Sequence, residues 1–545
     1  MNQFNTFALD IASYDAMARS GARILRWPTG QKQYEILSYD LPRGLTAYIR
    51  GMAGSGGLDY VAAISCLFDI YLCMARLGRA AIDLTNIRQA GGSALFDPAG
   101  NPILAYLQSD TPRLAETYTD IIPDGEPGLS FSLSAKDRLR ALKRDLIMIA
   151  TPRSGRCDAL ARGGLIENFL SGCGRQSINF NPYLVDWPSL GPIPRVMRDI
   201  ADALTTIFQD LLERHVDLAP GLAEKVRHAA DLFAQAWLNR SWHNAWHLQR
   251  WHFPWRIGDV AVGTSPKMLG RLLGHLYQSH GKTVIRCAHG GERPFFDDDH
   301  WGLSEFPFCD RYLGHSHGEA DAIARRHREG RLIRVHDQPP VCVGLGSRRH
   351  QNIYTMMHDR ADLPARQAKK VMFVASSFLG EFSSHIPAIK PADVLIADLE
   401  IQVMSELRKA GFEILFKPHP KAVIGSGSIY QGCFDALVSR PFDPLRDDVD
   451  VYVFDYAGSA FFDALASRRG VVLIDTKLRP FDPTTIDDLL ARIEIVPASA
   501  DEQLRLRVDP VALAAATKRA GERQECPDWF ARRYFDGAES CEWIG

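Results

Sequence analysis

Short hydrophobic runs alternate with longer segments of helical spacing along most of this chain. Such alternation is typical of parallel sheets whose strands are connected by helices. The pattern is most regular after residue 366, where an amphipathic helix is predicted at 398–412 and Gly411 ends it. Strands are predicted around it at residues 369–378, 413–420, 449–460 and 470–475. The chain is therefore predicted to be α/β, with a Rossmann-like sheet domain in its C-terminal half.

The N-terminal half is less regular, but its start predicts a similar unit. A strand is expected at 45–51, a glycine turn at 52–57, a helix at 58–77 and a second strand at 80–84. The apolar segment 61–75 contains Asp69 and is shorter than the roughly 20 residues of a spanning helix, so we interpret it as a buried helix. Further on, helices are predicted at 134–150 and 194–238, and strands at 282–291 and 309–316.

These units predict two Rossmann-like domains with a cleft between them and extra helices in the N-terminal half. The Pro-rich, charged stretch 358–367 is the natural linker, which gives domains at residues 1–365 and 366–500. Residues 501–545 are expected to form a helical tail that packs back on the fold. Ligands of open α/β sheets bind outside the carboxyl ends of the strands, so the residues at those ends are the first candidates for a site.

The composition of the chain excludes several classes of protein. The 545 residues carry 63 Lys+Arg against 65 Asp+Glu, and a net charge of -2 does not favour nucleic-acid binding. The ten cysteines contain no CxxC pair, which indicates reduced thiols in a cytosolic protein. The first residues lack the basic and apolar regions of a secretory signal. We expect a cytoplasmic protein without a transmembrane segment, leaving peripheral contact with the inner face of a membrane open.

Three successive strand ends in the C-terminal half carry groups that suit a phosphate. Hydrogen-bond donors and helix N-termini at such ends stabilise phosphate charge. A polar turn that ends a strand, or ordinary helix N-capping, would explain each one separately. The predicted donor-binding residues are Ser376, Ser377, Lys417, His419, Asp455, Gly458 and Ser459.

A strand end in the N-terminal half supplies candidates for proton transfer. His289 is followed by two glycines, and an imidazole titrates near neutrality, so it is a candidate general base. Glu292 could do the same work, as could Asp297, Asp298 and Asp299. A buried histidine bonded to the backbone is the structural alternative.

Three motifs follow one another along the chain: a His-Gly, then a His-Pro, then a D-Y-x-x-S-x-x-x-D-x-L unit. Together they resemble GT-B-fold transferases of bacterial surface carbohydrate synthesis, namely CDP-glycerol glycerophosphotransferases and capsule-type Kdo or sialic-acid transferases. The matching residues are His289, Gly290, His419, Pro420, Asp455, Tyr456, Ser459, Asp463 and Leu465. The resemblance implies that His419 and Ser459 contact donor phosphates and that His289 is the base, with His419 also counted among the catalytic residues.

The resemblance implies a glycosyltransferase or glycerophosphotransferase. It would move a unit from a nucleotide-activated donor, of the cytidine type such as CMP-Kdo or CDP-glycerol, to a surface glycan or related acceptor in polysaccharide biosynthesis. The first domain would then be the acceptor side and the second the donor side. A UDP-sugar transferase or epimerase on the same fold, and a non-catalytic scaffold in polysaccharide assembly, are the alternatives.

Other motifs add no cofactor. The glycines at 51, 54, 56 and 57 do not complete GxGxxG, so we assign Gly54, Gly56 and Gly57 to the acceptor side, together with Gly290 and Arg293. The pair His243 and His247 lacks the glutamate of HExxH, and the acidic run 297–299 is typical of a solvated loop. We therefore expect neither a tightly bound cofactor nor a required metal; the nucleotide-activated donor is a substrate.

Overall fold

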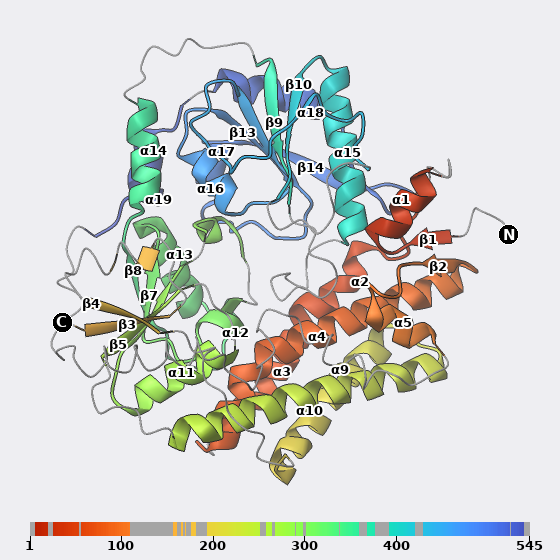
Figure 1. The fold of residues 1–545 in the computed structure, drawn as a ribbon, viewed down its shortest axis with the longest axis vertical. Coiled ribbons are helices and arrows are strands. Elements are labelled where there is room, and N and C mark those ends of the chain that lie inside the picture. Colours follow the sequence, from red (N-terminus) through yellow and green to blue (C-terminus); the bar gives the residue numbers. More distant parts are fainter. Residues whose placement is uncertain are drawn as a thin grey trace, which may run out of the picture.

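The computed structural model describes most of the chain and contains two large, mainly parallel sheets beside a layer of long helices, with a small two-stranded sheet near the N-terminus (Figure 1). The described residues are 6–19, 25–53, 56–109, 156–160, 165–166, 169, 176–180, 193–250, 258–263, 268–288, 290–297, 301–336, 338–358, 368–376, 392–419, 429–523 and 525–538. The predicted α/β class, with two Rossmann-like sheets and extra helices in the N-terminal half, is confirmed.

The C-terminal sheet has seven strands in the order β11-β10-β9-β12-β13-β14-β15. All its pairs are parallel except β14 with β15. The four predicted strands are present; three are shorter than expected, and the strand at 470–475 has the predicted bounds. The bounds are β9 (Lys370–Val374), β10 (Glu413–Lys417), β11 (Ala436–Leu437), β12 (Val451–Phe454), β13 (Gly470–Asp475), β14 (Glu494–Ala500) and β15 (Leu506–Val508).

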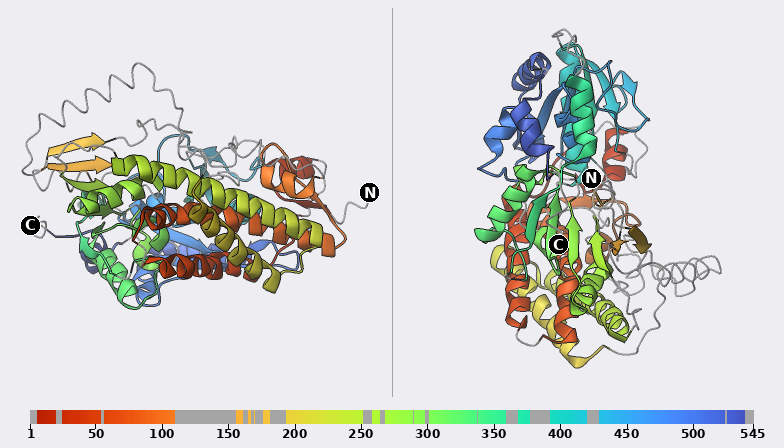
Figure 2. Two further views of the ribbon diagram at one scale, coloured as in Figure 1. Left: turned by 90° about the horizontal axis from the view of Figure 1, so that it is seen from below. Right: turned by 90° about the vertical axis from the view of Figure 1, so that its left-hand side faces the viewer.

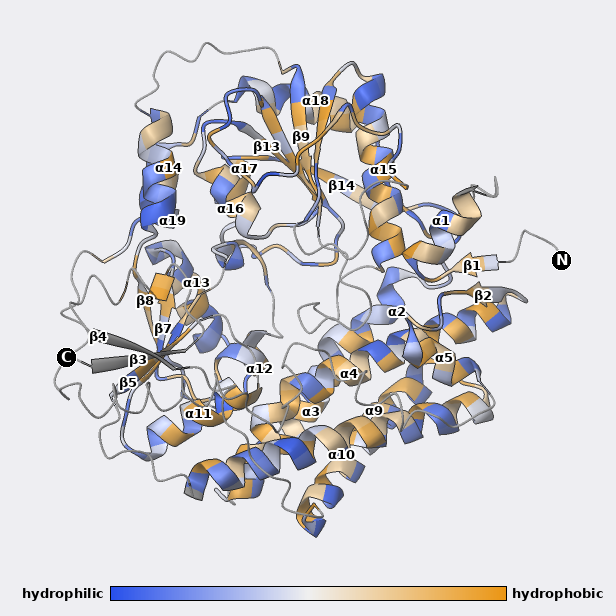
Figure 3. Cartoon of the chain, in the orientation of Figure 1, coloured by the Kyte–Doolittle hydropathy of each residue, from blue (hydrophilic) through white to orange (hydrophobic). Residues whose placement is uncertain are grey.

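Both faces of the central part of this sheet are covered, which is why all four residues of β12 are apolar and buried. In β12, Val451 and Val453 pack into one hydrophobic cluster, and Tyr452 and Phe454 pack into a second. Figure 3 shows the hydrophobic colour of β9 and β13 between helices whose outer faces are polar. The helices of this domain are α15 (Asp393–Lys409), α16 (Ser459–Leu465), α17 (Ile486–Leu490) and α18 (Pro510–Glu522).

The second sheet lies in the N-terminal half and has six parallel strands in the order β4-β3-β5-β6-β7-β8. The strands predicted near 282–291 and 309–316 are its β6 and β7. The strand bounds are β3 (Arg156–Leu160), β4 (Gln176–Phe180), β5 (Asp259–Val262), β6 (Val284–Cys287), β7 (Arg311–Gly314) and β8 (Val341–Gly344). Its helices are α11 (Met268–Ser279), α12 (Trp301–Glu305), α13 (His317–Arg328) and α14 (Arg348–His358), with a 3-10 turn, η5 (Arg293–Phe295).

The start of the chain is helical, and the strands predicted at 45–51 and 80–84 are wrong. The first segment lies in α3 (Leu41–Gly51) and the second in the long helix α4 (Leu58–Gln89). The 52–57 loop therefore joins two helices. Helix α4 is buried on nearly all sides by its neighbours, so it lacks the amphipathic period that identifies a helix from sequence.

The helices around α4 form the layer seen at the lower right of Figure 1, and α10 runs beside α4 (Figure 2). The helix predicted at 194–238 is present as two. Among the described residues, one helix, α4, is long enough and apolar enough to cross a membrane. Its most apolar 18-residue stretch is 83% buried inside the fold. The elements of this region are β1 (Thr6–Ala8), α1 (Ile11–Arg19), α2 (Gln31–Glu35), η2 (Ile36–Asp40), β2 (Ser93–Leu95), α5 (Pro102–Gln108), α9 (Arg195–His215) and α10 (Pro220–Arg250).

The end of the chain packs back onto both halves. Strand β15 extends the C-terminal sheet, so the predicted helical tail also contains a strand. Helix α19 (Asp528–Tyr534) then crosses to the N-terminal sheet domain, where the ring of Phe530 stacks 6.1 Å from that of Phe295. The helix predicted at 134–150 lies outside the described residues.

Candidate functional site

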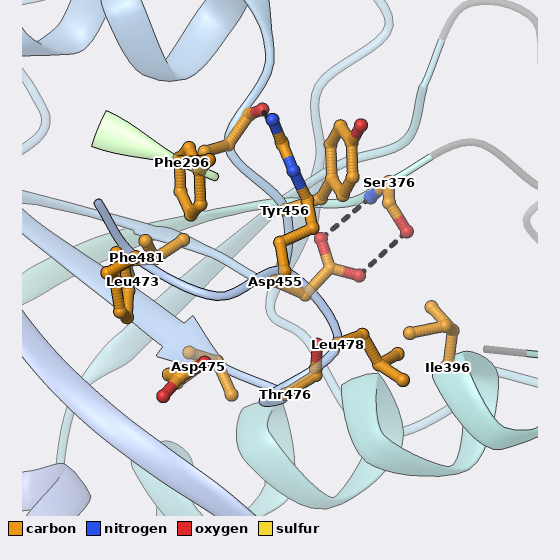
Figure 4. A pocket seen from close by; sticks show the side chains of 13 residues that line it. Phe296, Ser376, Ile396, Asp455, Tyr456, Leu473, Asp475, Thr476, Leu478 and Phe481 are labelled. Carbon is orange, nitrogen blue, oxygen red and sulfur yellow. Dashed lines mark hydrogen bonds between the residues drawn. The ribbon is translucent and has the colours of Figure 1, made fainter. Parts of the chain in front are cut away.

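An open pocket of about 530 Å³ lies at the carboxyl ends of β9, β12 and β13. The chain passes from β9 outward to β10 and β11, then returns to place β12 on the other side of β9. This reversal is the switch point at which open α/β sheets bind ligands. The lining residues are Phe296, Ser376, Ile396, Asp455, Tyr456, Ala457, Leu473, Ile474, Asp475, Thr476, Leu478, Arg479 and Phe481 (Figure 4).

Ser376 and Asp455 form the polar pair between the two strands at the reversal. The backbone N–H and the hydroxyl of Ser376 each donate a 2.9 Å hydrogen bond to the Asp455 carboxylate (Figure 4). Both residues are buried, with exposed fractions of 6% and 4%. Bonds to an ionised acceptor are stronger than neutral ones, so this pair fixes the loops after β9 and β12 relative to each other. The sequence prediction placed both residues at the donor site, and both line the pocket.

Arg479 brings a positive charge to the pocket between aromatic rings. Its guanidinium carbon lies 4.1 Å from the ring centroid of Phe296 and 5.0 Å from that of Tyr456. One guanidinium nitrogen donates to the carbonyl of Ala457 at 3.0 Å. Stacking and this bond hold the planar, permanently charged group in one orientation, which suits it to bind a phosphate.

Asp475 supplies a second carboxylate at the end of β13. Burial raises its pKa, and the backbone N–H of Lys477, which donates to Oδ1 at 2.8 Å, partly opposes that rise. The hydroxyl-bearing Thr476 follows it and also lines the pocket. The pocket therefore offers acceptors at one strand end and a cation and aromatic faces nearby.

One wall of the pocket comes from the other sheet domain. Phe296 pairs with Phe481 as an isolated antiparallel bridge, and their rings stack 5.1 Å apart. The Asp297 N–H donates to the Pro480 carbonyl, and the Asp482 N–H donates to the Phe295 carbonyl, both at 2.8 Å. The pocket is thus closed by a contact between the two domains.

The predicted phosphate-binding pair on β10 is not part of this pocket's lining. Lys417 is buried, burial lowers its pKa, and its ammonium donates to the Pro418 carbonyl at 2.8 Å. His419 is half-buried just beyond the strand. Both stand one strand away from the reversal, so their assignment to the donor stays a prediction.

The small-residue turn after β12 reaches the pocket through Ala457. Gly458 is the N-cap of α16, and Ser459, the first residue of that helix, is exposed outside the pocket's lining. Ser377 lies outside the described residues, as does His289. Their predicted roles therefore stay predictions.

The turn after β6 approaches the C-terminal domain closely. Gly290 and Gly291 have φ angles of +103° and +106°, and a Cβ on Gly291 would lie 2.3 Å from the ring of Phe462 on α16. Glycine is therefore required here for the contact, whatever else the turn does. Glu292, the predicted alternative base, is 9% exposed in the same turn.

The structure gives the surroundings of three predicted acceptor-side residues, Arg293, Gly56 and Gly57. Arg293 is buried, its guanidinium pairs with the Glu305 carboxylate, and it also donates to the Tyr312 hydroxyl at 3.0 Å. The charge of Arg293 is thus paired inside the fold, and its acceptor-side assignment stays a prediction. Gly56, with φ +53°, and Gly57, the N-cap of α4, form a connection between helices and not a turn at a strand end. Gly54 lies outside the described residues.

Among the described residues, no group of three or more His, Cys, Asp or Glu side chains is arranged to hold a metal ion. His243 and His247 lie on α10, and Asp297 forms an ion pair with Arg331. Asp298 and Asp299 lie outside the described residues.

Sequence reasoning missed Arg479, Asp475 and Phe296 as pocket residues. The sequence could have indicated Asp475 and Arg479, because the buried strand at 470–475 ends in Asp475 and is followed by Thr476 and basic residues. Phe296 carried no such signal, since it reaches the pocket through a contact between domains.

No protein-family profile and no curated protein matches the sequence. Solved structures align with it at low identity. Arabidopsis thaliana UGT89C1, complexed with UDP-L-rhamnose, is 11% identical over 72% of this chain and 87% of that chain, with a TM-score of 0.32. The Streptomyces sp. SF2575 glycosyltransferase SsfS6, complexed with thymidine diphosphate, is 11% identical over 69% and 96%, with a TM-score of 0.27. The wall teichoic acid polymerase TagF is 12% identical over 74% and 94%, with a TM-score of 0.31. TM-scores of this size place the chain in no family, so we infer function from the chemistry of the pocket.

Proposed function

We propose that this protein is a transferase that binds a nucleotide-activated donor in the pocket at the ends of β9, β12 and β13. It moves the activated unit, a sugar or a glycerophosphate, to a hydroxyl group of a glycan or related acceptor. One observation carries the proposal. A stacked arginine and two carboxylates meet at the switch point of a parallel sheet, under a wall supplied by the other domain.

Each part of a nucleotide has a suitable partner there. The half-buried ring of Tyr456 offers an aromatic surface for a base, and Asp475 offers oxygens that accept hydrogen bonds from ribose hydroxyls. Arg479 has five N–H donors in a fixed plane, which match phosphate oxygens.

In glycosyl transfer the bond between the sugar carbon and the donor's phosphate oxygen breaks while the acceptor oxygen bonds to that carbon. The phosphate leaves with the electron pair, and Arg479 stabilises the charge that develops on its oxygens. The acceptor's proton passes to a base on the opposite domain, for which His289 and Glu292 are the candidates. A cytidine-type donor is proposed from the sequence resemblance.

Thermal stabilisation by nucleotides tests the proposal, because a ligand that binds only the folded state raises its melting temperature. The panel is CMP, CDP, UDP, GDP and NAD. We expect stabilisation by a pyrimidine nucleotide and, with Arg479→Gln, roughly tenfold weaker binding or more, since hydrogen bonds to charged groups contribute about 1.5–3 kcal/mol.

The matched control is Arg440→Gln, which changes an exposed arginine outside the pocket. Its nucleotide affinity should equal that of the wild type. Stabilisation by UDP without cytidine nucleotides would favour the UDP-sugar alternative, and a response to NAD would favour an epimerase. No response to any nucleotide would contradict the proposal and favour a non-catalytic scaffold.

A further inference from the structure

A second pocket, of about 690 Å³, lies where the N-terminal helices meet the C-terminal domain. Helix α2 and the following η2 form one side, and the ends of β14 and β15 form the other. Figure 1 shows α2 at the junction between the helical layer and the lower end of α15. Leu478 lines this pocket and also the nucleotide pocket, so the two are neighbours across one loop.

The lining divides into an apolar wall and a polar rim. Leu395 and Leu506 are buried and, with Leu478 and Leu504, make the wall. Glu35 and Lys477 are exposed and carry opposite charges at the mouth of the pocket. A ligand that fits this division has an apolar part beside a part rich in hydroxyls.

The inner polar surface is held in place by buried hydrogen bonds. The hydroxyls of Thr29 and Tyr34 both donate to the Asp83 carboxylate. The indole N–H of Trp27 donates to the Tyr34 hydroxyl at 3.0 Å, and the amide of Asn86 donates to the Thr29 hydroxyl at 3.1 Å. These bonds fix the two hydroxyls before any ligand arrives, which reduces the entropy lost on binding.

The loop between the pockets is tied to α2. The side-chain amide of Gln31 donates to the Lys477 carbonyl at 2.6 Å, and Lys477 has a φ of +59° although it is not glycine. The next residues, Leu478 and Arg479, turn into the nucleotide pocket. A molecule in the second pocket would therefore touch the same loop as the donor.

We propose that the second pocket binds the acceptor, and that the acceptor is a glycoside with an apolar aglycone. The leucine wall takes the aglycone, and the rim of Gln31, Glu35 and Lys477 binds sugar hydroxyls. A sugar hydroxyl then extends past Leu478 towards the donor. This inference rests on the proposed function and adds a substrate class to it.

Octyl β-D-glucoside, used below its micelle concentration, is the probe, and its binding is measured by saturation-transfer NMR. Gly30 lines the second pocket, has an ordinary φ of -69°, and a Cβ built on it meets no atom within 4 Å. Gly30→Phe should therefore fill the pocket without straining the backbone and weaken binding at least tenfold. Ala500→Trp obstructs the same pocket from the opposite wall and should have the same effect.

The matched control is Gly221→Phe, because Gly221 also has open space around its Cβ and lies on α10. It should bind the probe as the wild type does. Glucose without the octyl chain should bind far more weakly than the glycoside. No binding to the wild type, or equal binding to Gly30→Phe and Ala500→Trp, would overturn the acceptor pocket.

Nucleotide stabilisation, measured on the same proteins, separates this inference from the proposed function. It should be unchanged in Gly30→Phe. If nucleotides stabilise the wild type and the glycoside does not bind, the acceptor pocket fails and the proposed function stands. If the glycoside binds and no nucleotide does, the proposed function fails, and the acceptor role fails with it.

Discussion

Replacing Asp482 with alanine should loosen the contact between the two domains that closes the proposed nucleotide pocket. Asp482 has an exposed fraction of 0% and follows directly on Phe481, which stacks on the pocket wall. Its carboxylate accepts hydrogen bonds from Arg325 at 2.6 Å and from Arg326 at 2.8 Å, both on α13 of the other domain. It also accepts one from the Thr484 hydroxyl at 2.6 Å.

The magnitude follows from what the substitution leaves behind. Arg326 is 1% exposed, so losing the carboxylate leaves a buried guanidinium whose other carboxylate partner, Asp297, lies 4.0 Å away. Removing one partner of a buried ion pair costs about 3–5 kcal/mol. Arg326 keeps its bonds to the carbonyls of Arg293 and Pro294, at 3.0 and 3.1 Å, so we expect the lower end. About 3 kcal/mol corresponds to a roughly 150-fold increase in opening of this contact.

The assay is urea denaturation at pH 7, with hydrogen exchange of residues 480–486 as a local readout. The control is Asp321→Ala, which changes an exposed aspartate on α13, the helix that carries Arg325 and Arg326; it should shift the urea midpoint little. Nucleotide affinity should fall with Asp482→Ala, because Phe296 loses its support. Equal stability and equal exchange in the Asp482 and Asp321 variants would refute this reasoning.

The same contact predicts a pH dependence. Burial raises the pKa of Asp482, but hydrogen bonds from Thr484 and the charge of Arg326 outweigh it, and the net pKa lies below its ordinary value. A group with a depressed folded-state pKa stabilises the fold above its unfolded pKa, about 3.9 for aspartate, and loses this contribution as the pH falls. The stability difference between wild type and Asp482→Asn should therefore shrink between pH 5 and pH 3.

Two further predictions concern the N-terminal side of the domain contact. Gly291→Ala should destabilise the protein more than Gly281→Ala. Both glycines have a positive φ, but a Cβ at 291 would lie 2.3 Å from Phe462, whereas a Cβ at 281 would meet nothing within 4 Å. Equal urea midpoints of the two variants would contradict this prediction. Burial raises the pKa of Glu319 to about 7, so its ionisation costs stability as the pH rises from about 4.5 to 7. Relative to Glu319→Gln, the free energy of unfolding of the wild type should fall by up to about 1.4 kcal/mol per pH unit across this window. If the pH–stability curves of the two proteins run parallel, Glu319 does not titrate there.

Much of the C-terminal domain could be predicted because its units are local. In 449–460 the apolar run, the small-residue turn and the helix follow one another, and β12 and α16 lie where that order puts them. The N-terminal helices could not be identified as reliably. Helix α4 is buried nearly all round, so residues 80–84 read as a short strand although they continue the helix.

The candidate site likewise contains residues that could be predicted from the sequence and residues that could not. Ser376 and Asp455 could be found because they follow strands directly, and neighbouring parallel strands bring their ends together. Phe296 and Arg479 could not be paired from sequence, since their contact depends on how two domains meet. The sequence predicted Lys417 as a ligand residue because it ends a strand, and it does not reveal that β10 lies one strand away from the reversal. The role of Lys417 stays a prediction.

Hydrogen exchange of the whole protein, with and without the nucleotide that stabilises it most, locates the donor directly. If the nucleotide binds at the switch point, residues 455–458 and 475–479 should become protected together, with 294–297 from the opposite domain. Protection in these segments should be lost in Arg479→Gln and kept in Arg440→Gln. Protection confined to other parts of the chain would place the nucleotide elsewhere and contradict the proposed function of this pocket.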